Sequence, residues 1–407
     1  MPPTRLLDLT RLLSRLGKGQ PTGVDRVEAA YLSHLLTLPS PVFALIRSKL
    51  GYLLLDQGGM VVFQKLIAGQ LPLPHADFLS RVTRRNDPML ARAETALRRV
   101  AIARGTRLRA MVQSHLPHGF SYLNTGHANL GSANLTAIKA AGGKIVVLIH
   151  DTIPLDYPEF TRRETIARFD KKLATTASHA DLVIHSASTT RAQTETHFQR
   201  HGRVPAGVVA PLGINRLHPG NISPREKSYF VALGTIEPRK NHALLLDLWQ
   251  NLHDTLPEDE IPHLLILGRR GWASAQLLHR LDTLPFRNRT VFELPNLPDD
   301  QVAGLMAHSC ALLFPSFVEG YGLPPLEAAS LGVTVVVPPL PVYKETLGDY
   351  PVYAAVEDSY SWLETVIRLK DEAKVQDQAR QGQNDGEKPV VKIPQWQEHF
   401  NTVLSIA

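Results

Sequence analysis

The residues that decide the fold read Lys144-Ile-Val-Val-Leu-Ile-His-Asp151. A continuous apolar run, most of it β-branched, is typical of a strand that is buried on both faces of a parallel sheet. The preceding residues, 135–141, have the character of a helix, which Gly142-Gly143 ends. The polar pair His150-Asp151 follows the strand directly. This segment therefore predicts one helix–strand step of a parallel α/β sheet, with polar groups at the carboxyl end of the strand.

The same alternation of helices and strands extends to both sides of this segment. A stretch rich in Pro and Gly, residues 211–228, interrupts it, and the alternation starts again at Tyr229. We therefore expect an α/β chain with two Rossmann-like, doubly wound parallel-sheet domains, residues 1–220 and 221–388. The expected strands are 6–9, 42–46, 52–55, 144–149, 181–185 and 208–210, then 229–233, 263–267, 290–292, 311–314 and 333–337.

Composition excludes several classes of protein. The chain has 407 residues, 43% of them hydrophobic and 20% charged, as in ordinary globular proteins. One cysteine, Cys310, excludes a disulfide scaffold. The longest apolar run, 145–149, is far shorter than the ~20 residues that cross a bilayer. Residues 1–16 lack the apolar stretch of a signal peptide, so we expect a cytoplasmic location.

Charge is distributed unevenly along the chain. Residues 1–220 contain 28 Lys and Arg against 14 Asp and Glu, whereas residues 221–407 contain 16 against 24. The basic half indicates nucleic acid, an anionic lipid surface or a phosphorylated substrate as partner. Nine arginines and two acids fall within 81–109, where a basic amphipathic helix is expected from Pro88. That helix is either a solvated face or a docking surface for an anionic membrane. The lack of interleaved aromatic residues argues against nucleic acid.

The strongest chemical signature reads Pro315-Ser-Phe-Val-Glu-Gly-Tyr-Gly-Leu-Pro-Pro-Leu-Glu-Ala328. It combines a strand end, a glycine loop and a helix whose first turn is expected to contain Glu327. Free amides of Gly322 and Leu323 at a helix start form an anion site that suits a diphosphate. Glu319 before the amides and Glu327 after them are placed to accept hydrogen bonds from hydroxyl groups.

A second signature, Gly234-Thr-Ile-Glu-Pro-Arg-Lys-Asn241, follows the first strand of the second half. Arg239 and Lys240 stand just before a helix, where they can neutralise phosphate oxygens through charge-assisted hydrogen bonds. This loop and the glycine loop therefore predict a diphosphate site at the carboxyl edge of the second sheet.

These segments resemble the retaining, two-Rossmann-domain glycosyltransferases of family four, the Glycos_transf_1 group. The resemblance spans most of residues 144–350 and is carried by the Glu-Pro-Arg-Lys-Asn loop and by Glu319 and Glu327. A third segment, His150-Asp-Thr-Ile-Pro-Leu-Asp-Tyr-Pro-Glu159, resembles one that is common in the polysaccharide and lipopolysaccharide branch. The resemblance implies a GT-B fold whose domains face a central cleft.

In that fold, residues 1–220 are the acceptor side and 221–388 bind the nucleotide sugar. Residues 389–407, with Trp396, are implied to form a helix that packs back on the N-terminal domain.

The resemblance also implies a role for each matching residue. His150 and Glu319 are the expected catalytic residues at the transferred sugar, and Glu327 is expected on the ribose hydroxyls. The other residues expected to bind the donor are Gly23, Arg239, Lys240, Gly268, Leu297, Gly322 and Leu323.

We expect no metal and no cofactor apart from the nucleotide-sugar substrate. No Asp-x-Asp stands at a plausible strand end, so the arginine, the lysine and the helix amides are expected to hold the diphosphate. His115, His118 and His127 match no dedicated metal-site spacing, and a solvent-exposed loop is the expectation there.

The expected function is retaining, metal-independent hexosyl transfer from a GDP- or UDP-linked sugar, with GDP-mannose as the first choice. The expected acceptor is a hydroxyl of a glycan or lipid-linked glycan in O-antigen, capsule or exopolysaccharide assembly. Three alternatives stay open: a nucleotide-sugar epimerase, a sugar phosphorylase, and a catalytically inactive module that binds nucleotide sugars.

Overall fold

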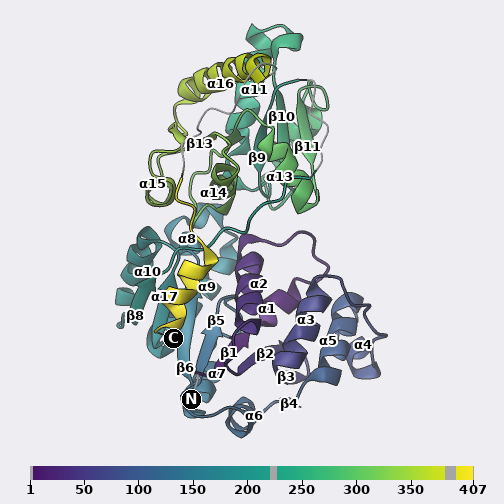
Figure 1. The fold of residues 1–407 in the computed structure, drawn as a ribbon, viewed down its shortest axis with the longest axis vertical. Coiled ribbons are helices and arrows are strands. Elements are labelled where there is room, and N and C mark those ends of the chain that lie inside the picture. The colour runs from purple at the N-terminus through teal and green to yellow at the C-terminus, as the bar shows by residue number, and fades with distance from the viewer. Residues whose placement is uncertain (1–2, 221–226, 381–390, 407) are drawn as a thin grey trace. The chain divides into compact units, whose positions relative to one another are not determined.

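The computed structural model describes residues 3–220, 227–380 and 391–406. The chain divides into two compact units (Figure 1). Unit 1 comprises Met1–Leu212 together with Trp396–Ala407, and unit 2 comprises Gly213–Gln395. The domain boundaries that the sequence suggested, after residues 220 and 388, fall next to or within segments 221–226 and 381–390, which lie outside the described residues.

Unit 1 is built on an eight-stranded sheet with the order β4-β3-β2-β1-β5-β6-β7-β8. The strand order reverses between β1 and β5, because the chain runs from β1 to one edge and from β5 to the other. The strands are β1 (Arg5–Asp8), β2 (Val42–Ser48), β3 (Gly51–Leu55), β4 (Ala103–Gly105), β5 (Ser121–Asn124), β6 (Lys144–Ile149), β7 (Leu182–His185) and β8 (Ala206–Val209).

One edge of this sheet differs from the all-parallel expectation. Strand β3 runs antiparallel to both β2 and β4, while the strand pairs from β2 to β8 through β1 are parallel. Only Lys49 and Leu50 separate β2 from β3. A parallel connection needs a crossover of a dozen or more residues, so this connection has to be a hairpin. Strand β5 is a further element that the sequence pattern did not indicate.

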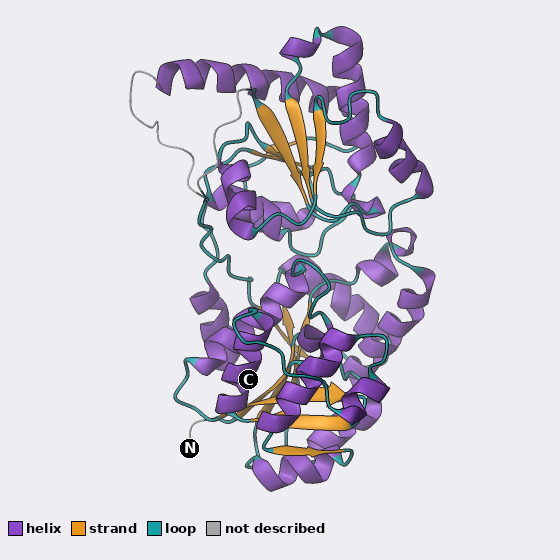
Figure 2. Cartoon of the chain, turned by 90° about the vertical axis from the view of Figure 1, so that its right-hand side faces the viewer, coloured by secondary structure: helices purple, strands orange, loops and turns teal. Residues whose placement is uncertain are grey.

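Helices cover the strands of unit 1, as Figure 2 shows. The C-terminal helix α17 belongs to this unit and packs on α2. The ring of Phe400 stacks on His34 at 3.8 Å between centroids, and His399 Nε2 lies 2.7 Å from the Tyr31 hydroxyl. The α-helices are α1 (Thr10–Ser14), α2 (Gly23–Leu36), α3 (Gln57–Ile67), α4 (Phe78–Thr83), α5 (Pro88–Val100), α6 (Leu108–His115), α7 (Ser132–Ala140), α8 (Ile153–Asp156), α9 (Arg163–His179), α10 (Ser188–Arg200) and α17 (Trp396–Leu404), with the 3₁₀ turn η1 (Pro158–Phe160).

Unit 2 holds a six-stranded parallel sheet with the order β11-β10-β9-β12-β13-β14. Its strands are β9 (Tyr229–Leu233), β10 (His263–Leu267), β11 (Val291–Leu294), β12 (Leu312–Leu313), β13 (Val335–Val337) and β14 (Val352–Tyr353). Its helices are η2 (Pro238–Lys240), α11 (His242–Thr255), η3 (Glu258–Glu260), α12 (Ala275–Thr283), α13 (Asp299–Ala307), α14 (Leu323–Ser330), α15 (Pro341–Leu347) and α16 (Ser359–Arg380).

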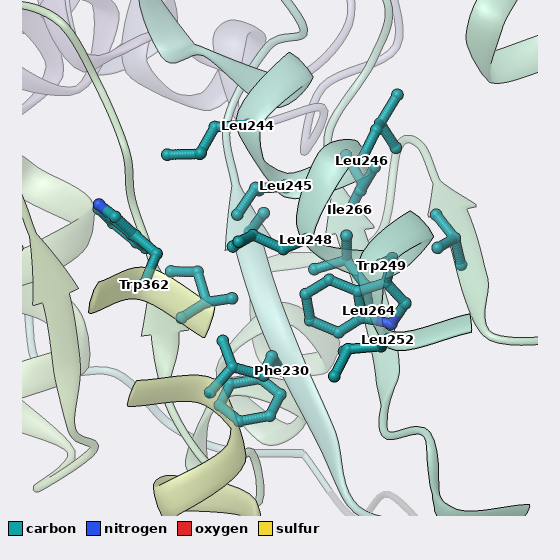
Figure 3. Close-up of a cluster of buried hydrophobic side chains, with 14 of the residues drawn as sticks. Phe230, Leu244, Leu245, Leu246, Leu248, Trp249, Leu252, Leu264, Ile266 and Trp362 are labelled. Carbon is teal, nitrogen blue, oxygen red and sulfur yellow. The ribbon is translucent and has the colours of Figure 1, made fainter. Parts of the chain in front are cut away.

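The core of unit 2 forms where the apolar face of α11 meets the sheet (Figure 3). Trp249 and Trp362 are both fully buried, and the Trp249 indole donates a 2.8 Å hydrogen bond to the Pro262 carbonyl. Phe230 of β9 meets Trp249 edge to face. This packing fixes β9 and α11, and with them the loop 234–241 that joins the two elements.

The strand order of unit 2 reverses between β9 and β12. In open α/β sheets, ligands bind outside the carboxyl ends of the strands at such a reversal. In unit 2 the loops there are 234–241, after β9, and 314–322, after β12. Across the described ranges, the structure has no helix with both the length and the apolar character needed to cross a membrane.

Candidate active site

The loop after β9 lies against the loop after β10 because two glycines allow it. Gly234 has φ +133°, and its N–H donates to the Leu267 carbonyl. A Cβ on Gly268 would lie 2.0 Å from the Gly234 carbonyl oxygen, which no side chain could tolerate. Gly268 was expected to bind the donor, and the structure gives it this packing role beside the Gly234 loop.

Arg239, Lys240 and Glu319 form one buried ion-pair cluster, although they come from two distant loops. Glu319 Oε1 lies 2.5 Å from Arg239 Nη1 and 2.6 Å from Lys240 Nζ. The side chains of Lys240 and Glu319 are only 9% and 7% exposed. Arg239, 24% exposed, also pairs with Glu237 at 2.7 Å. Two cations thus face two carboxylates in the described structure.

Further contacts hold the lysine in place. Its Nζ lies 3.8 Å from the centroid of the Phe314 ring, a cation–π distance. The Phe317 N–H donates to the Arg239 carbonyl at 2.8 Å, which joins the two loops through their backbones. The cluster is therefore positioned by the carboxyl ends of β9 and β12.

The protonation states in the cluster follow from burial and from the neighbouring charges. Burial lowers the pKa of Lys240 to about 8, against the opposing effect of Glu319. Burial alone would raise the pKa of Glu319, but Arg239 and Lys240 outweigh it and hold the pKa below its ordinary value. Glu319 is therefore an anion near neutral pH, and Lys240 is mostly a cation that titrates close to pH 8.

Helix α14 begins at Leu323, earlier than an expected first turn containing Glu327 requires. Glu327 consequently lies in its second turn, not its first, and is 4% exposed. Gly322 caps the helix with φ 86° and ψ 51°, and a Cβ there would lie 2.5 Å from the Tyr343 ring. Pro324 and Pro325 have no N–H, so the amides of Gly322 and Leu323 are the donors that the helix itself leaves unused at this end.

The donor-binding residues expected in unit 2 all follow carboxyl ends of its strands. Leu297 comes after β11 and next to Asn296, which has φ 58°. Gly268, the Arg239–Lys240–Glu319 cluster and the start of α14 follow β10, β9 and β12. The structure thus places these residues at one edge of one sheet, where cations and helix amides can meet an anion.

Gly23 lies in unit 1, where it is the first residue of α2. Thr22 caps this helix and forms a capping box with Asp25. Asp25 in turn pairs with Arg11 at 2.8 Å and with Arg15 at 3.1 Å. Ion pairs of Asp25 with Arg11 and Arg15 therefore connect the residues on either side of the glycine loop before α2, which the sequence pattern did not indicate.

His150 also lies in unit 1, directly after β6, and is partly buried. Its Nε2 donates to the Thr125 carbonyl at 2.6 Å, and its ring centroid is 5.3 Å from that of His127. Burial lowers the pKa of His150 to about 4. Burial and the neighbouring His150 ring lower the pKa of His127 to about 3. Both rings are neutral at neutral pH, which leaves His150 Nδ1 as a hydrogen-bond acceptor.

The expectation of solvent exposure holds for His118, which lies in a loop, and for His115 at the end of α6, but it is wrong for His127. Its ring packs against those of His150 and Phe169, and its Nε2 lies 2.7 Å from the Leu148 carbonyl oxygen. The three-histidine spacing could not reveal this, because the contacts come from β6 and α9. Among the described residues, no group of three His, Cys, Asp or Glu side chains is arranged to hold a metal ion.

Glu28 of α2 is a buried acid that the sequence analysis missed. Its side chain is fully buried, and among the described residues neither carboxylate oxygen has a hydrogen-bond partner. A Cβ on Gly126 would lie 2.2 Å from Glu28 Oε1, so the acid packs directly on that glycine. Burial raises its pKa to about 8. A signal was available, because Glu28 falls on the helix face that buries Val27 and Tyr31.

Comparison with known proteins finds a family that resembles unit 2. The family model described as "Glycosyl transferases group 1" matches residues 214–385. Residues 214–385 are therefore similar in sequence to the group 1 glycosyl transferases. The matched range contains the ion-pair cluster, the start of α14 and the core around Trp249.

Two curated Escherichia coli proteins are similar to the chain. One is a serotype-specific mannosyltransferase WbdA, 29% identical over 241 residues, which are 55% of this chain and 29% of that protein. The other is O-antigen chain mannosyltransferase B, 30% identical over 230 residues, which are 53% of this chain and 58% of that protein. The chain thus matches less than two thirds of either relative's length.

Solved structures share the fold of both units. Anabaena Alr3699/HepE in complex with UDP has a TM-score of 0.59 at 14% identity, with 99% of this chain and 98% of that chain covered. The pneumococcal O-GlcNAc transferase GtfA in complex with UDP and GlcNAc has a TM-score of 0.51 at 15% identity, over 74% of this chain and 60% of that one. The chain therefore has the GT-B fold class, with two α/β domains whose sheets are parallel apart from the β2-β3-β4 edge of unit 1.

Proposed function

We propose that the chain transfers a hexosyl group from a nucleotide diphosphate to a hydroxyl of a glycan or lipid-linked glycan during surface polysaccharide biosynthesis. The similarity of residues 214–385 to the group 1 glycosyl transferases, together with the two similar mannosyltransferases, supports glycosyl transfer in this process. Mannose from GDP-mannose is our first choice of donor, because both relatives are named mannosyltransferases.

One observation carries the proposal: the Arg239–Lys240–Glu319 cluster lies at the strand reversal of unit 2, on the loops that follow β9 and β12. A diphosphate is the anion that would suit two cations and two helix amides at such an edge. When the diphosphate binds, its oxygens accept the hydrogen bonds that Arg239 and Lys240 donate to Glu319 in the described state. The freed carboxylate is then available for sugar hydroxyls.

The proposed chemistry is departure of a diphosphate from the anomeric carbon. The bond from that carbon to the diphosphate oxygen breaks, and the acceptor oxygen bonds to the same face, so that configuration is retained. The acceptor proton moves to the departing diphosphate oxygen. Positive charge placed beforehand on the leaving group is worth several kcal/mol, roughly, in a site that excludes water. We propose that Arg239 and Lys240 supply this charge and that turnover needs no metal ion.

Binding of the nucleotide is tested first, by thermal shift with GDP, UDP, dTDP and their sugars. A ligand at 100 times its Kd stabilises the folded state by about 2.7 kcal/mol. We expect one nucleotide class to raise the melting temperature of the wild type, and the double variant Arg239→Gln/Lys240→Gln to lose this shift. Arg289→Gln is the matched control, because it removes an exposed cation of the same unit that pairs with Glu258.

Turnover then separates the proposal from its alternatives. We expect transfer from the selected donor to a glycan acceptor, unchanged in EDTA, with the donor's anomeric configuration retained in the product. Release of nucleotide without an acceptor would indicate an epimerase, and a requirement for orthophosphate a phosphorylase. Nucleotide binding without any turnover would indicate an inactive module. A double variant that keeps both the thermal shift and turnover would refute the proposed site.

A further inference from the structure

Helix α4, Phe78–Thr83, exposes apolar side chains to solvent and buries a polar one, the reverse of the usual pattern in a globular protein. Phe78 is 76% exposed, Leu79 56% and Val82 61%, whereas Ser80 is fully buried. Phenylalanine and leucine are normally the buried residues and serine the exposed one. The outward face of α4 is therefore apolar, and its inward face is polar.

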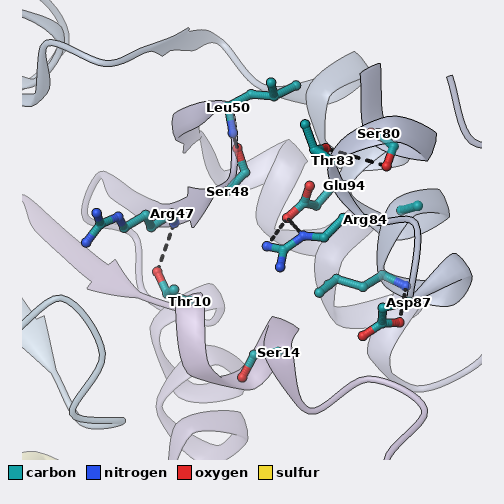
Figure 4. A network of polar contacts seen from close by, with 12 residues as sticks. Thr10, Ser14, Arg47, Ser48, Leu50, Ser80, Thr83, Arg84, Asp87 and Glu94 are labelled. Atoms are coloured by element: carbon teal, nitrogen blue, oxygen red, sulfur yellow. Dashed lines mark hydrogen bonds and ion pairs between the residues drawn. The ribbon is translucent and has the colours of Figure 1, made fainter. Parts of the chain in front are cut away.

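Polar contacts anchor α4 to α5, as Figure 4 shows for Arg84 and Glu94. Arg84 binds the buried Glu94 through Nη2 at 2.6 Å and through Nε at 2.9 Å. On the other side, Arg98 of α5 pairs with Asp77 and with the Ser80 hydroxyl. Ion pairs and hydrogen bonds, rather than the exposed side chains of Phe78, Leu79 and Val82, thus attach the inward face of α4 to α5. These three apolar side chains are not part of the core.

Helix α5 cannot provide the membrane surface that the arginine-rich sequence suggested. Its apolar residues Leu90, Ala93 and Leu97 are buried inside unit 1, so the helix presents no continuous apolar face to lipid, although Met89 in its first turn is 44% exposed. Two of its arginines are also engaged, because Arg98 pairs with Asp77 and Arg92 Nε donates to the Pro74 carbonyl at 2.9 Å. The amphipathic pattern from Pro88 is therefore used for internal packing.

The exposed apolar side chains of α4 form a surface that we call the outer patch. Arg81 and Arg85 flank it and are exposed. The two acids of segment 77–89 are engaged, Asp77 with Arg98 and Asp87 as the cap of α5, where it accepts from the Leu90 N–H at 3.0 Å. The charge that this segment presents is thus positive. The outer patch consists of Phe78, Leu79 and Val82.

We propose that the outer patch inserts into the interface of an anionic phospholipid bilayer, with Arg81 and Arg85 against the lipid phosphates. Bulky apolar side chains flanked by guanidinium groups are complementary to such a surface. This inference concerns unit 1 alone and does not depend on the proposed glycosyl transfer. A second copy of the chain and a protein partner are the competing occupants, and the experiment separates them from lipid.

The experiment measures co-sedimentation of the full chain with vesicles of phosphatidylglycerol and phosphatidylcholine. We expect binding to the mixed vesicles and not to pure phosphatidylcholine. The variant Phe78→Ser/Leu79→Ser/Val82→Ser is expected to weaken partition at least a hundredfold, because each buried apolar side chain contributes about tenfold. Arg81→Gln/Arg85→Gln should weaken it by roughly tenfold or more at low salt. Val204→Ser, which removes a 41% exposed apolar residue elsewhere in unit 1, is the matched control.

A second reporter covers the case in which the triple variant folds poorly. The variant Phe78→Trp should lose fluorescence on vesicles that carry brominated acyl chains, whereas Val204→Trp should not. The proposal is overturned if the folded triple variant binds like the wild type, or if the tryptophan introduced by Phe78→Trp is not quenched. It is also overturned if neither protein binds vesicles and the triple variant converts a dimeric wild type into a monomer. That last result would assign the patch to a second copy of the chain.

Discussion

Replacing Glu319 with Gln removes one charge from the buried cluster and keeps the shape of the side chain. The carboxylate oxygen lies 2.5 Å from Arg239 Nη1 and 2.6 Å from Lys240 Nζ, and Glu319 is 7% exposed. Removing one partner of a buried ion pair costs about 3–5 kcal/mol, because the other charge stays buried and uncompensated. Arg239 keeps Glu237 and is partly exposed, so we expect the lower end, about 3 kcal/mol of unfolding free energy at pH 7.

The cost should depend on pH through Lys240. Its pKa is lowered to about 8 by burial, and Glu319 is the strongest influence that raises it, so Glu319→Gln lowers the pKa further. A lysine whose pKa is lower in the folded state binds fewer protons there, and stability rises with pH between the folded and unfolded pKa values. In the variant this interval starts at a lower pH. The stability difference from the wild type should therefore shrink between pH 7 and pH 9.

Urea unfolding followed by tryptophan fluorescence measures this, because Trp249, Trp272 and Trp362 all lie in unit 2. The control is Glu258→Gln, which breaks an exposed pair with Arg289 and should cost only about 0.5 kcal/mol. The reasoning fails if Glu319→Gln is as stable as the control variant at pH 7, or if its deficit grows as the pH rises.

Three further changes have definite expected outcomes. The pKa of Glu28 is about 8 in the folded state, so the wild type loses stability as the pH rises from ~4.5 through 8. Glu28→Gln should remove roughly 3–5 kcal/mol of that loss, measured by urea unfolding at pH 5 and pH 9. Gly268→Ala places a Cβ 2.0 Å from a backbone oxygen and should abolish nucleotide-induced thermal shifts, whereas Gly105→Ala, with nothing within 4 Å, should not. Tyr31→Phe leaves the buried His399 without its hydroxyl partner and should cost about 1–3 kcal/mol in unit 1, read from the Trp396 fluorescence change on unfolding.

Strands with strong local signals were predictable from the sequence. Residues 229–233 and 263–267 form β9 and β10 with the expected ends, and α11 starts soon after Lys240, where a helix was expected. Each strand is a short, largely apolar run between polar residues, which burial on both faces requires. Strand β5, Ser121–Asn124, lacks such a run, and only its place between β1 and β6 makes it a strand.

The candidate site was predictable as a set of loops but not as a cluster of charges. Polar signatures at strand ends indicate which loops share an edge of the sheet. The ion pair between Arg239 and Glu319 joins residues 80 positions apart, and no local pattern reports such a contact. From the sequence, the cations and Glu319 were expected on different parts of the donor, whereas the described state pairs them with one another.

Amphipathicity reveals an apolar face without revealing what covers it. Helix α5 has a clear periodic pattern, and the interior of unit 1 covers its apolar residues. Helix α4 has six residues, too few for a periodic signal, yet it is the helix that leaves Phe78, Leu79 and Val82 uncovered. The arginine-rich stretch includes residues with an internal role, because Arg84 and Arg98 attach α4 to α5 through ion pairs with Glu94 and Asp77. What each arginine and apolar side chain contacts, and not the number of arginines in a segment, therefore distinguishes a helix that packs internally from a surface that can bind lipid.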